Sequence, residues 1–180
     1  MALLPIIKAP DPRLKLAAAP VGRVTAKHRR LMDDMLETMY AAVGVGLAAP
    51  QVGVLERIIV VDLARGEEPA RPLCLADPEI LWQSPELALY EEGCLSFPDQ
   101  YAEVERPARV RVRYLDRDGE PREIETDGLL ATCLQHEIDH LSGVTFVDHL
   151  STLKRNMILR RLRKAKRLGE APEPAAGLAL

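Results

Sequence analysis

The most specific chemistry in this chain lies in the pentapeptide His136-Glu137-Ile138-Asp139-His140. In a helix, residues four positions apart share a face, so both imidazoles can bind one metal ion. Glu137 is rotated by about 100° from His136 around the helix axis, so it lies beside the ion, where its carboxylate can exchange protons with a bound water molecule. Two solvent-facing histidines are the alternative, but the surrounding apolar helix disfavours it. The pattern predicts a metal-dependent hydrolytic centre.

A catalytic metal site takes about three protein ligands and keeps one open position, so a third ligand must come from elsewhere. Cys133 is about 10 Å along a helix from His140, too far to share an ion, and we expect it to pack as a small buried side chain. Cys94 follows Gly93, which permits close backbone approach. Its thiolate would complete a Cys/His/His site suited to zinc or ferrous iron; an inert buried cysteine is the alternative. For Cys74 we expect ordinary packing.

Small residues dominate the segment Gly44–Gln51, which reads Gly-Val-Gly-Leu-Ala-Ala-Pro-Gln. The lack of side-chain bulk leaves room for another backbone to pass close by. A helix cap followed by a tight turn would explain the same glycines. The segment lacks the Gly-Lys-Ser/Thr of a phosphate-binding loop. Gln51, at its end, could donate an amide hydrogen bond into a site.

In chain order, the segments Gly44–Gln51, Glu92–Ser96 and His136–His140 resemble the three signature motifs of the peptide deformylase family. Those motifs are Gly-φ-Gly-φ-Ala-Ala-x-Gln, Glu-Gly-Cys-φ-Ser and His-Glu-x-x-His, where φ is apolar. The similarity runs from Pro10-Asp-Pro-Arg-Leu to about Lys154. It implies a hydrolase that removes the formyl group from the N-terminal formylmethionine of nascent polypeptides and releases formate.

The resemblance assigns Cys94, His136 and His140 as metal ligands, with water in the fourth position. Glu137 would act as general base and then general acid: it accepts a proton as the hydroxide attacks the formyl carbon and delivers it to the leaving amine. One divalent ion per chain is implied, Fe2+ natively, although Zn2+ or Ni2+ can occupy such sites in purified protein. The ligand set alone does not decide among these metals.

The resemblance also implies how the substrate is held. The backbone N–H of Leu95 and the side-chain amide of Gln51 would donate hydrogen bonds to the oxyanion of the tetrahedral intermediate. The Gly44–Leu47 segment, above all Val45 and Gly46, would pair with the peptide backbone as an added strand. Such pairing suits an enzyme that accepts nearly every nascent chain.

An apolar pocket for the methionine side chain aligns in this family with Tyr90, Leu129, Thr132 and Cys133. Thr132 departs from the aliphatic residue that is usual at its position. Four residues separate it from Gly128 in the same expected helix, so its hydroxyl is expected to bond the Gly128 carbonyl.

Two other classes of protein share some of these features. A zinc endopeptidase also carries His-Glu-x-x-His and usually takes its third ligand from beyond the motif, where His149 would serve; the Glu-Gly-Cys-Leu-Ser segment argues against it. A non-catalytic ribosome-associated binding protein would be expected to have lost catalytic residues, yet the set is complete here.

The elements that must position these residues follow from hydrophobic periodicity and from glycine and proline punctuation. Residues 1–22 are predicted to form a Pro-rich extended arm. A helix then runs from the N-cap Thr25 to about Ala42 and is ended by Gly44 and Gly46. The pattern further predicts strands over 57–63 and 109–114, a hairpin turn over 116–119, a helix from Leu129 to about Leu141 and a last helix over about 151–168. The order favours an α+β fold. The resemblance implies antiparallel β-sheets packed around the central His-Glu-x-x-His helix, with an N-terminal and a C-terminal helix.

The composition is that of an ordinary globular protein: 47% of the 180 residues are hydrophobic, 28% are charged and three are cysteines. This excludes a disordered chain and a disulfide-rich miniprotein. We expect one catalytic domain over residues 1–168 and a flexible Pro/Ala-rich tail over 169–180. We found no secretion signal and no membrane-spanning stretch, which favours the cytoplasm, and no DNA or membrane partner is expected.

The basic residues are unevenly distributed. Eight of the 24 Lys and Arg residues fall within 154–168, which contains no acid, so the rest of the chain carries 16 basic against 27 acidic residues. One interpretation is a solvated helix face around Leu153, Met157, Leu159 and Leu162. The other, suggested by related bacterial deformylases, is docking near the ribosomal exit tunnel, where a positive field favours RNA contact.

Overall fold

A computed structural model describes residues 2–64, 66 and 68–169 of the chain. Its elements are, in order, the short 3-10 helix η1 (Pro12–Lys15), α1 (Ala26–Ala41), β1 (Gly46–Ala48), the 3-10 helix η2 (Ala49–Val52), β2 (Ile58–Val61), β3 (Leu73–Gln83), β4 (Leu87–Cys94), β5 (Phe97–Pro107), β6 (Arg109–Leu115), β7 (Pro121–Asp127), α2 (Gly128–His140), the 3-10 helix η3 (Phe146–His149) and α3 (Thr152–Leu168). The predicted α+β class is confirmed.

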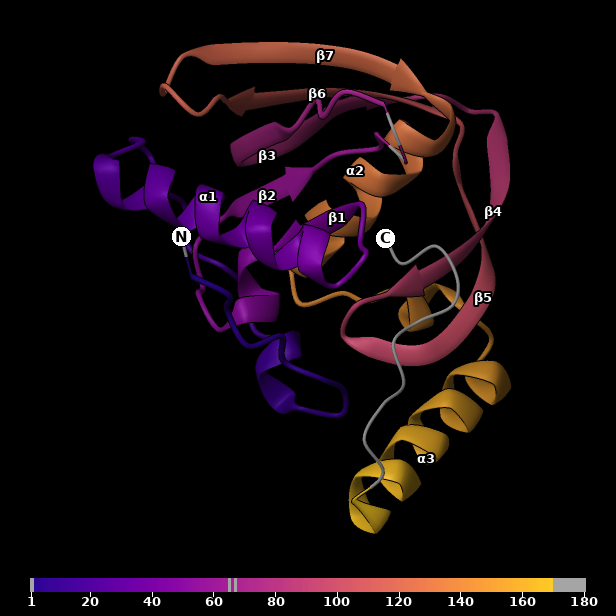
Figure 1. The fold of residues 1–180 in the computed structure, drawn as a ribbon. Helices are drawn as coiled ribbons and strands as arrows, with labels where there is room; N and C mark the ends of the chain where they lie inside the picture. The colour runs from indigo at the N-terminus through magenta and orange to yellow at the C-terminus, as the bar shows by residue number, and fades with distance from the viewer. Residues whose placement is uncertain (1, 65, 67, 170–180) are drawn as a thin grey trace.

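The strands form two antiparallel sheets on either side of α2. The larger has the order β1-β2-β3-β6-β7, and the smaller is the β4–β5 hairpin. Figure 1 shows α2 between the two sheets, α1 across β1 and β2, and α3 beyond the β4–β5 hairpin. The central position of α2 brings residues of both sheets to the face of one helix.

The strand β2 shows why the large sheet is covered on both sides. All four of its residues are buried, and successive side chains of a strand point to opposite faces. Ile58 and Val60 pack with the methionines of α1, whereas Ile59 and Val61 pack with Leu134 of α2. The uninterrupted apolar run predicted from the sequence therefore fills two separate cores.

The predicted strand with one wet face is confirmed in β6. Val110 and Val112 are buried, while the alternating arginines are exposed. Arg111 pairs with Glu125 of β7 at 3.1 Å, and Arg113 pairs with Glu79 of β3 at 2.6 Å. The exposed face of the sheet therefore carries ion pairs between neighbouring strands. Such exposed pairs contribute little individually.

The α1 helix ends within one residue of the predicted position, but the residue that reverses the chain differs from the prediction. The helix ends at Ala41, and the residue that reverses the chain is Val43, with φ of 57°. The backbone N–H of Gly44 donates to the carbonyl of Met39 at 2.9 Å. Gly46 lies in β1 and not in a helix cap, so the reason for a glycine there must be sought in the site.

Two further expectations concern the C-terminal tail and membrane-spanning helices. The expected flexible tail lies, apart from Gly169, outside the described residues. None of the described helices combines the length and the hydropathy required to cross a membrane.

Gly143 closes the turn after α2 and gives a test of the packing there. Its φ is +70°, and a Cβ on it would lie 2.4 Å from the carbonyl oxygen of Lys15. Gly22 has a similar φ of +66° but no atom within 4 Å of such a Cβ. We expect Gly143→Ala to lower the free energy of unfolding, measured with urea, by more than the about 1–3 kcal/mol that backbone strain alone costs. Gly22→Ala is the control for strain alone, and equal losses in the two variants would contradict the predicted clash with the N-terminal arm.

Candidate active site

Cys94, His136 and His140 come together between the two sheets. Their candidate ligand atoms all lie within 4.8 Å of one another, and each residue is at most 3% exposed. The Cys94 Sγ lies 3.3 Å from Nε2 of His140. The two histidines are on the same face of α2, as their spacing predicted, and Cys94 reaches them from the end of β4.

The site can be tested for its fit to a metal ion. Within the described residues, Nε2 of His136 is buried and has no hydrogen-bond partner, while its Nδ1 lies 2.8 Å from Oε2 of Glu92. Both carboxylate oxygens of Glu137 are likewise buried and unpartnered. Buried polar atoms rarely remain unpaired in native proteins. One sulfur and two imidazole donors suit a divalent transition metal, so these residues fit such an ion.

A second layer of charged residues holds His136. Glu92 is fully buried and accepts hydrogen bonds from Nε and Nη2 of Arg106. Arg106 also donates to Asp139 at 2.8 Å. Burial alone would raise the pKa of Glu92, but the hydrogen bonds from His136 and Arg106 hold that pKa below its usual value. The ionised Glu92 therefore makes Nδ1 of His136 the donor, which leaves Nε2 free for a metal.

Glu137 lies against the small-residue segment. Burial raises the pKa of Glu137 well above its usual value, and the charge of Glu92 acts in the same direction. A Cβ on Gly46 would lie only 2.4 Å from Oε1 of Glu137 and 3.0 Å from Sγ of Cys133. Gly46 is therefore required because α2 packs directly on the backbone of β1.

Gln51 and Leu95 lie next to the cluster. The side-chain Oε1 of Gln51 accepts from the N–H of Ala48 at 2.8 Å. This orients Nε2 toward Sγ of Cys94 at 3.4 Å and Oγ of Ser96 at 3.2 Å. Leu95 follows Cys94 in the turn between β4 and β5. The Gln51 amide is thereby fixed with its N–H groups toward the candidate metal position.

The first two motif segments also interlock through Gly44. A Cβ at this position would lie 2.7 Å from Cδ1 of Leu95. The glycine is thus explained by close packing of one motif segment on the other.

The residues expected to line the methionine pocket come from α2 and β4. The hydroxyl of Thr132 donates to the carbonyl of Gly128 at 3.3 Å, as expected. The hydroxyl of Tyr90 lies 3.8 Å from the position a Gly128 Cβ would take. Leu129 is half-buried on the first turn of α2. Cys133 is fully buried outside the ligand cluster, as its distance from His140 predicted.

The structure does not bring every candidate to the site. His149, the alternative third ligand, lies on η3, and its Nε2 is 2.7 Å from Oδ2 of Asp139. Cys74 packs in the core beside α1. Sequence reasoning missed Arg106, which no motif marks. The available signal was that Glu92 and Asp139 each lie within a motif segment expected to form the site, because a carboxylate buried there needs a compensating cation.

Arg106 gives a test of this second layer. Removing one partner of a buried ion pair leaves an uncompensated charge and costs about 3–5 kcal/mol. We expect Arg106→Met to lower the free energy of unfolding by about that much, and bound metal per chain to fall with it. The control is Arg109→Met, whose guanidinium is half exposed and pairs with Glu86 at 3.7 Å; its expected loss is under about 1 kcal/mol. Similar losses of unfolding free energy in the two variants would show that the buried ion pairs of Arg106 do not stabilise the protein more than an exposed pair does.

Together, the fold and the clustered sulfur, imidazole and carboxylate groups define a metal-dependent hydrolase of the α+β class. Residues 3–156 match the profile of the polypeptide deformylase family. The chain is 61% identical over 177 residues to the peptide deformylase of Methylocella silvestris, covering 97% of this chain and 90% of the relative. The chain belongs to the polypeptide deformylase family, whose members remove the N-formyl group from nascent peptides.

Solved structures agree with this assignment. The crystal structure of peptide deformylase from Ehrlichia chaffeensis superposes with a TM-score of 0.88 at 40% identity, covering 94% of this chain and 100% of that one. A Met-Ala-Ser-bound crystal structure of a peptide deformylase from Acinetobacter baumannii gives a TM-score of 0.77 at 40% identity, covering 83% and 99%. The fold expected from the motifs is therefore the one observed.

Proposed function

We propose that this deformylase hydrolyses N-formylmethionyl peptides at the site formed by Cys94, His136, His140 and Glu137, with residues 1–168 acting as one catalytic domain. The observation that carries this assignment is the convergence of three ligand atoms within 4.8 Å beside a buried carboxylate that has no partner in the described part of the chain. Fe2+ is the proposed native metal, and the donor set also suits Zn2+ or Ni2+. The proposed setting is the cytoplasm.

The proposed mechanism divides the chemistry among the residues of the site. A divalent ion held by Cys94, His136 and His140 would activate a water molecule and polarise the formyl carbonyl. Glu137 accepts the proton of the attacking water and donates it to the leaving amine. The Leu95 N–H and the Gln51 amide donate hydrogen bonds to the developing oxyanion. Glu92 keeps His136 in the tautomer that binds the metal.

The proposed substrate lies along β1. Within the described residues, β1 is an edge strand of the five-stranded sheet, so Val45 and Gly46 can pair with an extended peptide. Tyr90, Leu129, Thr132 and Cys133 form the proposed pocket for the methionine side chain. The Met-Ala-Ser bound to the relative from Acinetobacter baumannii supports a peptide of this kind as ligand.

The reaction and the roles can be tested together by formate release from formyl-Met-Ala-Ser, with protein purified without oxygen and analysed for metal. We expect Glu137→Ala to abolish turnover while metal stays near one per chain. Gln51→Ala should lower kcat by about 10²–10³-fold, because an oxyanion donor is lost. Glu123→Ala, at an exposed position of β7, is the control. Metal-loaded wild-type protein that releases no formate would overturn the proposed function.

We further propose that α3 docks the enzyme on ribosomal RNA near the nascent chain. Ile158 and Leu162 are buried against the domain, whereas the basic residues of the helix are exposed. Exposed Leu153 and Met157 add an apolar component to the free face. Phosphate contacts by Lys and Arg give binding that weakens steeply with salt.

This docking is tested by cosedimentation with ribosomes over a range of salt concentrations. We expect the double variant Arg160→Glu and Arg163→Glu to reduce binding at least tenfold at low salt, because four units of charge change on one helix. Formate release from the free peptide should be unaffected and controls for folding. Undiminished cosedimentation would support the other interpretation, a merely solvated helix face.

A further inference from the structure

Residues 7–9 of the N-terminal arm contact both segments that supply the proposed oxyanion donors. The N–H of Ile7 donates to the carbonyl of Gln51 at 2.7 Å, and the N–H of Ala9 donates to the carbonyl of Ser96 at 2.8 Å. Ile7 and Ala9 are each 8% exposed and pack in one apolar cluster with Cys94. Three consecutive arm residues thus join two segments that lie more than forty positions apart in the chain.

The residue between these two contacts is Lys8. Its Nζ donates to the backbone carbonyl of Leu95. Burial lowers the pKa of the Lys8 ammonium, while the charges of Cys94 and Asp99 act in the opposite direction. An ammonium group is costly to remove from water, so a partly buried one needs a hydrogen-bond acceptor, and the Leu95 carbonyl provides it. The positive charge of the donor strengthens this hydrogen bond.

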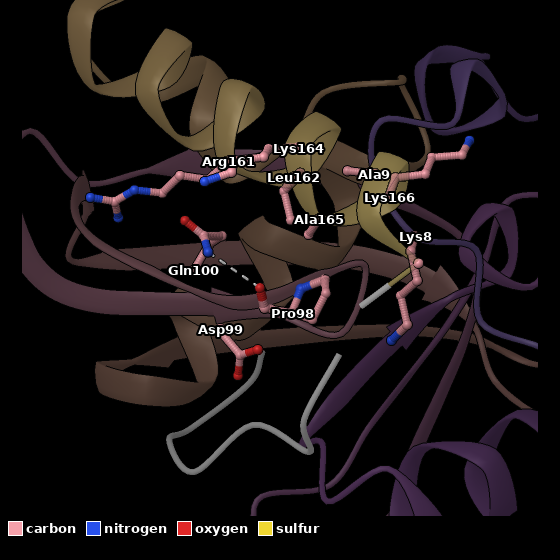
Figure 2. Close-up of a pocket in the computed structure, with 11 residues that line it drawn as sticks. Lys8, Ala9, Pro98, Asp99, Gln100, Arg161, Leu162, Lys164, Ala165 and Lys166 are labelled. Atoms are coloured by element: carbon pink, nitrogen blue, oxygen red, sulfur yellow. Dashed lines mark hydrogen bonds between the residues drawn. The ribbon is translucent and has the colours of Figure 1, made fainter. Parts of the chain in front are cut away.

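Figure 2 shows the surroundings of Lys8. A cavity of about 610 Å³ lies between α3 and the start of β5. Leu162 and Ala165 of α3 face Pro98 and Gln100 across it, and the Lys8 side chain extends away from α3. Lys8 thus lines this cavity, and its ammonium contacts the Leu95 carbonyl in the turn that follows Cys94.

We propose that Lys8 is a positioning residue for oxyanion stabilisation, because its hydrogen bond to the Leu95 carbonyl holds the Cys94–Leu95–Ser96 segment in place. The proposal rests on the proposed function, which assigns the Leu95 N–H and the Gln51 amide as oxyanion donors. Such donors act through fixed orientation before the reaction begins, so a small rotation of this backbone segment weakens the N–H contact to the oxyanion. Lys8 touches no reacting atom.

Other contacts separate this role from a general structural one. The backbone bonds of Ile7 and Ala9 hold the arm without the Lys8 side chain. Cys94 is held independently by its pairing with Phe97 and by the amide of Gln51. Loss of the ammonium should therefore leave the arm docked and the metal ligands in place, and affect mainly the orientation of the Leu95 peptide.

The experiment compares Lys8→Met, Lys8→Arg and the control Lys27→Met in steady-state assays with formyl-Met-Ala-Ser. Lys27 is exposed on α1 and pairs with Glu56. We expect Lys8→Met to lower kcat about tenfold, less than the about 10²–10³-fold loss of a donor itself, with KM changed less than twofold and metal near one per chain. Lys8→Arg, which retains a cationic donor, should recover most of kcat, and Lys27→Met should match wild type.

Each other outcome overturns the proposal. A Lys8→Met kcat within twofold of wild type, in a preparation where Gln51→Ala shows its large loss, removes Lys8 from the mechanism but keeps the proposed function. Loss of metal or of folded structure in Lys8→Met assigns Lys8 a structural role instead. A failure of Lys8→Arg to recover activity argues against the hydrogen bond. Wild-type protein without formate release would instead reject the proposed function itself.

Discussion

The contact on which the site depends is the hydrogen bond between Glu92 and Nδ1 of His136. It fixes the orientation of the His136 ring and leaves Nε2 unpaired at the point that Cys94 and His140 also approach. The contact exists only because Arg106 neutralises a fully buried carboxylate. A ligand geometry on α2 is therefore set by a side chain from β4 and another from β5.

The packing of the small-residue segment follows from the same arrangement. With α2 enclosed between two sheets, β1 passes so close to it that no side chain fits at Gly46. The β4–β5 turn closes over the same segment at Gly44. The glycines thus bring backbone and catalytic groups into contact, and the edge of β1 that results is the one proposed to bind the peptide.

Much of this was predictable from the sequence because it depends on local pattern. The spacing of His136 and His140 required only a helix, and the alternation in β6 required only one wet face. Arg106 was not predictable, because its role arises from long-range contacts with Glu92 and Asp139. The position at which α1 ends was predicted to within one residue, but the residue that reverses the chain was not, because glycine was expected where Val43 adopts the left-handed conformation.

Cys94 shows the limit of spacing arguments in another way. From the residues alone it was open whether this cysteine was a ligand or an inert core residue, since a strand end forty positions away carries no geometric relation to a helix. The motif resemblance supplied the relation, and the hairpin β4–β5 places the thiol beside His140.

Charge balance gives a physical reason why this centre needs a cation. Burial raises the pKa of the Cys94 thiol, and a negative charge on Glu137 would raise it further. The thiol therefore loses its proton only when a cation compensates the charge of the thiolate. Once it forms, the thiolate adds a negative charge close to the ionised Glu92, and Arg106 already pairs with both Glu92 and Asp139. A divalent ion compensates negative charge in an interior where uncompensated charge is costly. The buried donor groups therefore favour a divalent cation at the point where Cys94, His136 and His140 meet.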